Sequence, residues 1–391
     1  MVARICQLVR THGDSVRQKW RLASVCERTL WDLSTCRTAV RGGHVENCAD
    51  CGRTHRFFNS CRNRHCPQCQ ADKARQWVET RIQRCVPVGH HQVVFTLPSE
   101  LRPLARQFPE VVYGMLFSAS AETLHAVAAT RSDATIGFTS VLHTWNRDLS
   151  FHPHVHSLVT TGGFQGSESG NRWVYGKCTN RFLFPVSVLR RVFRAKMFDR
   201  LDTAHRQGIV QFDAHPSRSG RKYATLKRAL RSKSWVVRVE PPGDRPVQQA
   251  LRYLGRYVYR VAIWDARVLS TGPGHVTFRT RGEGRCTLKP VEFVRRLMLH
   301  VLPRGFRKIR HYGLYAPSNA SRCAEARTLF ETKPSPLEPP EAPREAEAAP
   351  RPRCRHCGGL LVRIEVDDWL MMLDDRQWHA EISAHLPWED L

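Results

Sequence analysis

The 391-residue sequence lacks any run of eighteen apolar residues, and its first twenty residues carry scattered basic side chains with no apolar core of a signal peptide. A transmembrane helix needs about 20 consecutive apolar residues, and a secretory signal needs an apolar stretch of roughly 7–15. We therefore expect a protein that neither spans a membrane nor is secreted. The 14 cysteines then predict reduced thiols and metal sites, not a disulfide framework.

Acidic residues are also scarce: 35 Asp and Glu stand against 61 Lys and Arg, which gives a formal net charge of +26. The deficit is confined to residues 1–330, because residues 331–391 carry 13 acidic and 7 basic side chains. A folded body with such a positive field attracts polyanions, and nucleic acid is the expected partner. A basic surface that serves solubility alone is the less favoured alternative.

Composition divides the chain into four predicted parts. Residues 1–88 form a helical entry and a zinc-binding domain. Residues 89–330 mix strands and helices without a regular βαβ repeat, which predicts an α+β domain on an antiparallel sheet. Residues 331–350 form a linker rich in Pro, Glu and Ala that cannot build a core. Residues 351–391 form a C-terminal tail with a single CxxC pair.

Hydrophobic periodicity places the elements of residues 89–330. Strands are predicted at 91–97, 136–145, 151–159, 172–175 and 235–240, with short strands between 268 and 288. Helices are predicted at 110–129, 184–206, 222–231, 246–263 and 290–302. The pair Gly162-Gly163 is predicted to close the histidine strand.

Two CxxC pairs near the N-terminus, fourteen residues apart, predict a zinc site. The four predicted ligands are Cys48, Cys51, Cys66 and Cys69. Each pair offers two thiolates from a tight turn, and four thiolates complete a tetrahedral site. Cys61 or His65 is an alternative ligand, or part of a second site. Basic residues around the cysteines favour DNA docking, and a purely structural zinc module is the alternative.

The C-terminal pair, Cys354 and Cys357, is half of a zinc site and needs two further ligands. The nearby candidates are Cys323, His356, His379 and His385. A partner subunit and a degraded site are the alternatives to a zinc site within this chain.

A histidine cluster on a predicted strand is the central feature of the chain. The segment 151–159 reads FHPHVHSLV. Because strand side chains alternate between faces, His154 and His156 point the same way and Val155 points into the core.

The segment 136–145 is rich in β-branched and aromatic residues and predicts the partner strand. A hairpin that turns near Leu149 and Ser150 sets His143 opposite His156. Three convergent imidazoles favour a metal site over ordinary strand histidines. They suit zinc, but the same set holds Mg²⁺ or Mn²⁺ when a phosphate supplies the remaining oxygen ligands, so both choices stay open.

The predicted helix 246–263 carries Tyr253 and Tyr257, whose spacing of four residues projects both phenols from one face. A stripe of three arginines runs beside them: Arg252, Arg256 and Arg260. Tyrosine pairs on helices usually pack in a core. The arginine stripe and the histidine strand together favour a functional pair here.

A basic loop at 304–310 is expected to contact the DNA backbone. Its candidate residues are Arg304, Arg307, Lys308 and Arg310.

Taken in order, these motifs resemble the two-tyrosine transposases of rolling-circle insertion sequences, the IS91 type of the HUH endonucleases. The similar segments are SCRNRHCPQCQ at 60–70, HTWNRDLSFHPHVHSLVTTGG at 143–163, YLGRYVYRVAI at 253–263 and EFVRRLMLHVLPRGFRKIRHYGLYA at 292–316. The resemblance covers roughly residues 30–320. It implies an HUH-type antiparallel sheet with flanking helices, preceded by a small zinc-binding domain.

The resemblance also implies a chemistry. Tyr253 or Tyr257 attacks single-stranded DNA at transposon ends and target, leaving a 5′-phosphotyrosine and a free 3′-hydroxyl. Mg²⁺ or Mn²⁺ is expected at His154, His156 and His143, and Zn²⁺ at the N-terminal cysteines. A homo-oligomer and a cytoplasmic, nucleoid-associated location are expected, without a membrane partner. The alternatives are a plasmid or phage replication initiator with the same chemistry and a zinc-bearing DNA-binding regulator that does not cut.

Overall fold

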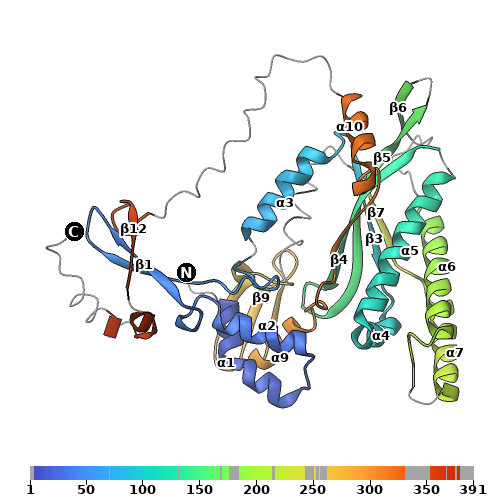
Figure 1. Cartoon of the computed structure of the whole chain (residues 1–391). Helices are drawn as coiled ribbons and strands as arrows, with labels where there is room; N and C mark the ends of the chain where they lie inside the picture. The colour runs from blue at the N-terminus through green and yellow to red at the C-terminus, as the bar shows by residue number, and fades with distance from the viewer. Residues whose placement is uncertain are drawn as a thin grey trace. The chain divides into compact units, whose positions relative to one another are not determined.

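The computed structural model divides the chain into two compact units, Met1–Cys69 with Lys333–Leu391 and Gln70–Thr332 (Figure 1). It describes residues 4–69, 71–130, 133–167, 170–175, 185–213, 216–242, 251, 255, 262–330, 353–366, 368–374 and 377–378. The predicted α+β class is confirmed, because helices and antiparallel sheets both contribute.

Six strands of the second unit form an antiparallel sheet in the order β11-β4-β5-β3-β7, with β6 paired to β5. The strands are β3 (His90–Thr96), β4 (Thr135–Trp145), β5 (Phe151–Ser167), β6 (Gly170–Tyr175), β7 (Val237–Glu240) and β11 (Ile309–Gly313). Five of them lie where the sequence predicts strands. β11 was missed, because its first two residues fall in the predicted basic loop.

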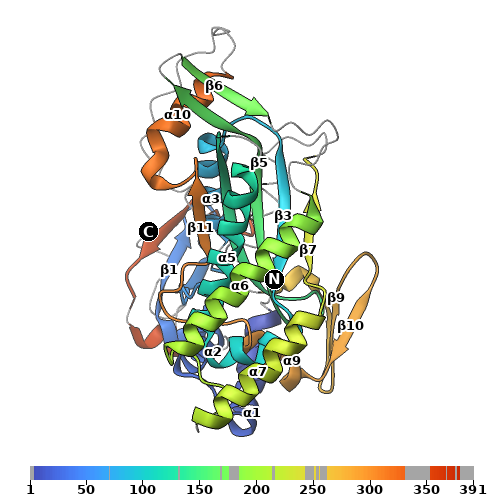
Figure 2. The ribbon, with the colours of Figure 1, turned by 90° about the vertical axis from the view of Figure 1, so that its right-hand side faces the viewer.

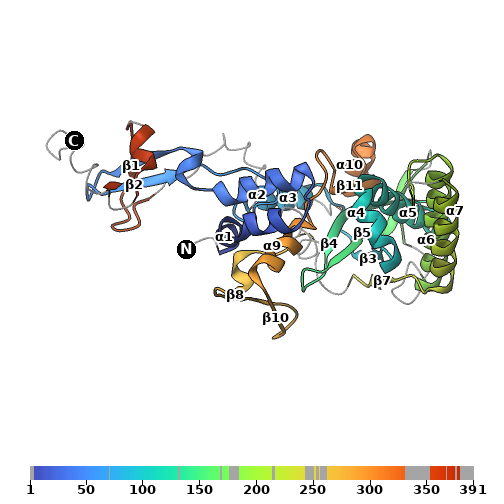
Figure 3. The ribbon, with the colours of Figure 1, turned by 90° about the horizontal axis from the view of Figure 1, so that it is seen from below.

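One face of this sheet is covered by helices. They are α4 (Arg102–Gln107), α5 (Pro109–Ala129), α6 (Val186–Arg206) and α7 (Pro216–Ser232). Figures 2 and 3 show α5, α6 and α7 together on one side of the strands. Phe95 of β3, Phe117 of α5 and Phe193 of α6 are fully buried between the layers. Their burial stabilises the sheet on this side by about 2–3 kcal/mol per side chain.

The opposite face of the sheet is only partly covered. Leu158 of β5 packs there in a second cluster with Leu251, Leu314 and Tyr315. Nearby elements are α3 (Ala71–Arg84) and α10 (Ala320–Thr328), which contributes Cys323 and Ala326 to this cluster. The Tyr315 hydroxyl lies 2.7 Å from Nε2 of His90 on β3, which ties the cluster to the sheet. The remainder of this face carries polar side chains and the histidines.

The prediction that Gly162 and Gly163 end the histidine strand is wrong, because β5 continues to Ser167. A Cβ on Gly162 would lie 2.5 Å from the Val174 carbonyl oxygen and 2.6 Å from the Trp173 indole nitrogen. A Cβ on Gly163 would meet Ala134 at 2.9 Å. The two glycines therefore serve close packing within the sheet and not a turn.

A small three-stranded sheet follows in the order β10-β9-β8, which confirms the short strands predicted between 268 and 288. Its elements are η3 (Asp265–Arg267), β8 (Val268–Thr271), β9 (Val276–Arg279) and β10 (Arg285–Leu288). The helix α9 (Pro290–Met298) packs on it through Phe293, whose ring lies 5.7 Å from that of Phe278. The short helices η2 (Ser99–Leu101) and η4 (Pro317–Asn319) also belong to the described part of this unit.

The first unit combines helices and strands from both ends of the chain. Its elements are α1 (Arg4–Lys19), α2 (Ser24–Thr35), η1 (Ala39–Arg41), β1 (Gly43–Cys48), β2 (Thr54–Phe58), β12 (Leu361–Ile364) and η5 (Asp368–Met372). The sheet order is β12-β1-β2, so a strand near the C-terminus pairs with β1. α1 is the predicted amphipathic entry helix, with Ile5, Val9 and Val16 fully buried.

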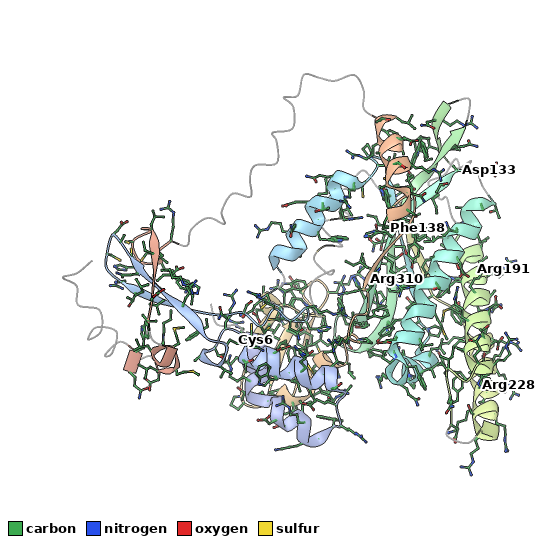
Figure 4. All side chains as sticks on the ribbon, viewed as in Figure 1. Cys6, Asp133, Phe138, Arg191, Arg228 and Arg310 are labelled. Atoms are coloured by element: carbon green, nitrogen blue, oxygen red, sulfur yellow. The ribbon has the colours of Figure 1, made fainter. Side chains whose placement is uncertain are left out.

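The outward surfaces of α6 and α7 are basic. Arg191 and Arg228 project away from the sheet in Figure 4, and both are exposed. Among the residues that the structure describes, no helix has both the length and the apolar character needed to cross a bilayer.

Candidate functional site

Three histidines converge on the open face of the sheet. His143 on β4 stands directly opposite His154 on β5, and His156 follows two residues later on the same face. The ring centroid of His143 lies 5.4 Å from that of His154 and 4.4 Å from that of His156, and the latter two lie 4.9 Å apart. One nitrogen from each ring lies within 4.8 Å of the others, as a shared metal ion requires.

The pairing register differs from the prediction. His156 lies opposite Val141, so the predicted pair of His143 with His156 is wrong. The cause is the turn between the strands, where the Asn146 amide bonds to the Ser150 carbonyl and Leu149 adopts a left-handed backbone with φ 62°. A shift of two residues keeps every side chain on its face. The three imidazoles therefore still share one face, and Val155 is buried in the core as predicted.

Hydrogen bonds orient two of the rings. Nδ1 of His154 lies 2.6 Å from the His152 carbonyl oxygen and donates to it, which leaves a lone pair on Nε2. Nδ1 of His156 lies 3.0 Å from the side-chain amide nitrogen, Nε2, of Gln92 on β3. When the amide turns its oxygen toward that ring, it accepts the Nδ1 proton and leaves Nε2 for a metal. Gln92 is thus a positioning residue, which the sequence analysis did not identify.

The three imidazoles are held neutral. Burial lowers the pKa of His154 to about 4. Burial, followed by repulsion from His156 and His154, holds the pKa of His143 well below its usual value. Burial and repulsion from His154 do the same to His156. Neutral imidazole is the form that ligates a metal ion.

A pocket of about 750 Å³ lies over the histidines. Its floor is the open face of β3, β5 and β7, and its rim comes from the β4–β5 turn and from residues 264–280. The basic side chains in its lining are Arg147, Arg238, Arg267 and Arg279, against one carboxylate among the described lining residues, Glu240. Arg267 donates to the carbonyl oxygens of Arg147 and Arg279 and so links the two parts of the rim. The pocket suits an anionic ligand.

The predicted DNA-binding loop reaches the edge of this site. Nζ of Lys308 lies 4.7 Å from the ring centroid of Trp145, a pocket residue, and its charge contributes to the lowered pKa of His143. Arg304 and Arg307 precede it in the same loop and are exposed. Lys308 therefore adds positive charge beside the histidines.

Arg310 lies elsewhere. It sits on β11 opposite Ser140, on the helix-covered face, and its guanidinium is 4.4 Å from the ring centroid of Phe117 on α5 (Figure 4). The structure therefore does not bring Arg310 to the histidine pocket.

The predicted tyrosine helix lies mostly outside the described residues. That applies to all five candidates: Tyr253, Tyr257, Arg252, Arg256 and Arg260. Leu251 and Gly255 are described and are helical. Leu251 is fully buried in the cluster that contains Leu158, two residues beyond His156 on the same face of β5. A Cβ on Gly255 would meet Val78 of α3 at 2.0 Å, so only glycine fits there.

The cysteines form two groups, so the prediction of one zinc site from two CxxC pairs is wrong. One group contains Cys36, Cys61, Cys66 and Cys69, and the other contains Cys48, Cys51, Cys354 and Cys357. Cys61, an alternative in the sequence analysis, is thus placed with Cys66 and Cys69. His65 belongs to neither group; its Nδ1 lies 3.1 Å from the Asn63 side-chain oxygen.

Sequence analysis missed Cys36, because it stands alone at the end of α2 with no paired cysteine. Its sulfur lies 3.5 Å from that of Cys69 and 3.6 Å from that of Cys66. A sequence pattern could have indicated the grouping of Cys48 and Cys51 with Cys354 and Cys357. Residues 48–52 and 354–358 both have the pattern CxxCG.

Known proteins similar to this chain are transposases. Residues 137–323 match a family model described as "Putative transposase", and residues 8–97 match the "Transposase zinc-binding domain" of the IS91 type. "Putative transposase y4qJ" of Sinorhizobium fredii is 37% identical over 384 residues, which cover 93% of this chain and 95% of the relative. The transposase for insertion sequence element IS801 of Pseudomonas savastanoi pv. phaseolicola is 27% identical over 300 residues, or 74% and 70% of the two chains. No solved structure matches.

The lowered pKa values predict metal binding that resists acid. Three histidines with ordinary pKa values near about 6.5 would lose about a thousandfold in affinity between pH 7.5 and 5.5, because protons compete at each ring. With a pKa of about 4, His154 is roughly 3% protonated at pH 5.5. With zinc already bound at the cysteines, we expect the affinity for Mn²⁺ to change less than about threefold between pH 7.5 and pH 5.5, as measured by isothermal titration calorimetry. A hundredfold loss over that interval would contradict the assignment of neutral, buried ligands.

Proposed function

Because this chain belongs to the insertion-sequence transposases of the IS91 type, we propose that it nicks and rejoins single-stranded DNA through a 5′-phosphotyrosine intermediate. The observation that carries the proposal is the cluster of His143, His154 and His156 at the floor of a basic pocket. A transposon end and a target strand would be its substrates, mobilising an insertion sequence by a rolling-circle-like mechanism.

The histidine cluster fits a divalent metal ion. Its ligand nitrogens lie within 4.8 Å of one another, its rings are neutral, and Gln92 and the His152 carbonyl orient two of them. Three protein ligands leave coordination positions for substrate oxygens, which suits Mg²⁺ or Mn²⁺ beside a phosphate. Such an ion offsets negative charge on the scissile phosphate.

The pocket lining would hold the DNA backbone. Arg238 and Arg279 are candidates for phosphate contacts next to the histidines, and Lys308 adds charge from the side of Trp145. Trp264, which is partly exposed, offers an aromatic surface on which an unpaired base would stack. The pocket thereby combines the two features typical of sites for single strands.

The proposed chemical step is an in-line displacement at phosphorus. The phenol oxygen of Tyr253 or Tyr257 gives up its proton and forms a bond to phosphorus, while the bond to the 3′ oxygen breaks and that oxygen gains a proton. The phosphodiester is replaced by a phosphotyrosine ester, so a later 3′-hydroxyl can reverse the step without ATP. Two tyrosines permit two successive transfers, one for each strand that must be opened.

Packing of the flanking residues supports this role for the tyrosine segment. Leu251 is buried against the sheet face that carries the histidines, through a cluster shared with Leu158. Gly255, between the two tyrosines in sequence, packs directly on Val78. The described parts of the segment are thus anchored on the histidine side of the sheet.

Zinc is proposed for the first cysteine group. The sulfurs of Cys36, Cys61, Cys66 and Cys69 lie within 4.8 Å of one another, as four thiolates around one tetrahedral ion do. The ion would fix the fold of the N-terminal zinc-binding domain, and the basic residues around it suit contact with DNA.

Removing both phenols tests the nucleophile. Tyr253→Phe with Tyr257→Phe should abolish the covalent adduct with a labelled single-stranded transposon end in the presence of Mn²⁺, because phenylalanine has no attacking oxygen. Oligonucleotide affinity should stay within about twofold, since phosphate contacts dominate binding. Denaturing gels and mass mapping of the DNA-linked peptide measure the adduct. Tyr259→Phe is the matched control and should retain it; an adduct in the double variant would refute the assignment.

Removing two imidazoles tests the metal site. His154→Ala with His156→Ala should eliminate Mn²⁺ binding at this site and slow cleavage at least about hundredfold, since the metal's contribution amounts to several kcal/mol. His152→Ala is the matched control, because His152 lies on the same strand and face but outside the cluster. Titration calorimetry follows binding and gel assays follow cleavage. Equal behaviour of the two variants would exclude the histidine cluster as the metal site.

A further inference from the structure

The two CxxCG segments of the first unit adopt matching turns. In each, the glycine after the second cysteine has a left-handed backbone, with φ 66° at Gly52 and 80° at Gly358. The amide of each glycine donates to the carbonyl oxygen of the first cysteine at 2.9 Å, from Gly52 to Cys48 and from Gly358 to Cys354. Such turns present two sulfurs to one side, as zinc knuckles do.

Strand pairing brings the two knuckles together. β1 ends at Cys48 and pairs antiparallel with β12, which begins just after the second knuckle. Cys48 lies opposite Leu361 in this pairing. Residues about 300 positions apart in the chain thus meet; Cys51 and Cys354 are separated by 303 positions.

The spacing of the four sulfurs fits one tetrahedral zinc ion. The Sγ atoms of Cys48 and Cys357 are 3.4 Å apart, those of Cys51 and Cys354 are 3.8 Å apart, and all four lie within 4.8 Å. Zinc–sulfur bonds of about 2.3 Å in a tetrahedron separate the sulfurs by about 3.8 Å. A disulfide would need about 2.05 Å, which none of these pairs approaches.

The surroundings of the sulfurs suit thiolates. Backbone amides of His356 and Gly359 point at the sulfurs of Cys354 and Cys357, each at 3.4 Å. Nε2 of His55 lies 3.3 Å from the sulfur of Cys354. Amide and imidazole donors around a thiolate ligand are typical of the outer shell of a zinc site.

We propose that Cys48, Cys51, Cys354 and Cys357 hold a second zinc ion, which fastens the C-terminal segment to the N-terminal zinc-binding domain. We call this site the zinc clasp. The match to the family's zinc-binding domain ends at residue 97, so two of the four ligands lie outside it. The proposal does not depend on the tyrosine chemistry.

Metal content of the purified full chain tests the clasp. We expect two zinc ions per chain by mass spectrometry of the metal, and one in Cys354→Ser with Cys357→Ser. Cys286→Ser, which removes a thiol far from both groups in the sequence, should retain two. A double variant that keeps two ions, or a parent chain that holds one, would overturn the proposal.

A second measurement covers the case in which the double variant does not fold. A protease site placed within residues 331–350 of the otherwise unchanged chain allows the linker to be cut after folding. The C-terminal fragment should remain bound during gel filtration and should separate when a zinc chelator is added. Separation before the chelator is added, or retention after the zinc has been removed, would contradict the clasp.

The cysteine groups also position a set of arginines. Arg37, Arg62 and Arg355 each directly follow a grouped cysteine, namely Cys36, Cys61 and Cys354. All three line one pocket of about 650 Å³ in the first unit. Arg37 and Arg62 have left-handed backbones, with φ 54° and 52°, which residues with a Cβ rarely adopt. Such a conformation at both positions indicates that the loops carrying the cysteines hold these two arginines in the lining of the pocket.

The charge of this pocket is available to a ligand. Arg37, Arg62 and Arg355 are exposed, and the structure shows no ion pair for them among the residues it describes. Arg41 in the same lining is instead neutralised by Asp32 at 2.6 Å. Phe57 and Phe58 contribute aromatic surface to the lining.

We infer that this arginine pocket binds the phosphate backbone of single-stranded DNA. The clasp supplies Arg355 and so completes the set. This inference rests on the assignment of the chain as a DNA-acting transposase, and it names a surface separate from the histidine pocket.

Salt dependence distinguishes this surface from general positive charge. Arg37→Ala, Arg62→Ala and Arg355→Ala combined should lower the slope of log affinity against log salt by about 2, because each single-strand phosphate contact contributes about 0.7. The matched control removes three exposed arginines from α6 and α7: Arg191, Arg221 and Arg228. Fluorescence anisotropy with a labelled oligonucleotide measures both variants and should show an unchanged slope for the control. Equal slopes in the two variants would overturn the inference, whereas a parent chain that binds no DNA would instead contradict the proposed function.

Discussion

The antiparallel pairing of β4 with β5 is the constraint on which the site depends. Helices α5 and α6 seal one face of these strands, so Phe138, Leu142 and Val155 must point into that core. Because side chains alternate along a strand, the intervening residues point to the open face, which places His143, His154 and His156 there. A slip of one residue would exchange the core and the imidazoles. The packing that stabilises the sheet is therefore also what holds the three imidazoles together.

Electrostatics restricts what such a cluster can bind. Three imidazoles with ring centroids 4.4–5.4 Å apart cannot all take up a second proton and become charged, because the charges would repel one another. Burial lowers their pKa values further. A divalent ion at the proposed site would bring two positive charges into a lining that already holds Arg238 and Arg279. Glu240 is the sole carboxylate among the described lining residues, which is too little to balance them. The lining therefore favours an anionic ligand, and in the proposed function a phosphodiester would both ligate the ion and neutralise the arginines.

Most of the sheet and the histidine cluster could be predicted, because their signals are local. Alternation over nine residues assigns His154 and His156 to one face, and periodicity over twenty residues identifies α5. The register of β4 and β5 could not be predicted, since it depends on the left-handed Leu149 in the turn. The strand end predicted at Gly162 and Gly163 was wrong because the need for glycine there also depends on residues distant from the strand segment that was analysed. What requires glycine there is the approach of Trp173 and Ala134, and spacing within β5 carries no trace of either contact.

The grouping of the cysteines shows where local spacing fails. Two CxxC pairs close in sequence satisfy every local criterion for one zinc ion, yet the pairing of β1 with β12 assigns Cys48 and Cys51 to sulfurs 303 or more residues away. Closing a loop of that length costs about 6 kcal/mol of chain entropy. Apolar contacts join the two ends as well: Cys48, Cys354 and Leu361 are buried in one cluster, and Val45 of β1 is buried with Leu370, Met371 and Trp378 in another. A structural zinc site, with apparent binding energies of about 10 kcal/mol or more, exceeds the cost of closure. The proposed metal and this apolar packing together make the distant pairing the stable one.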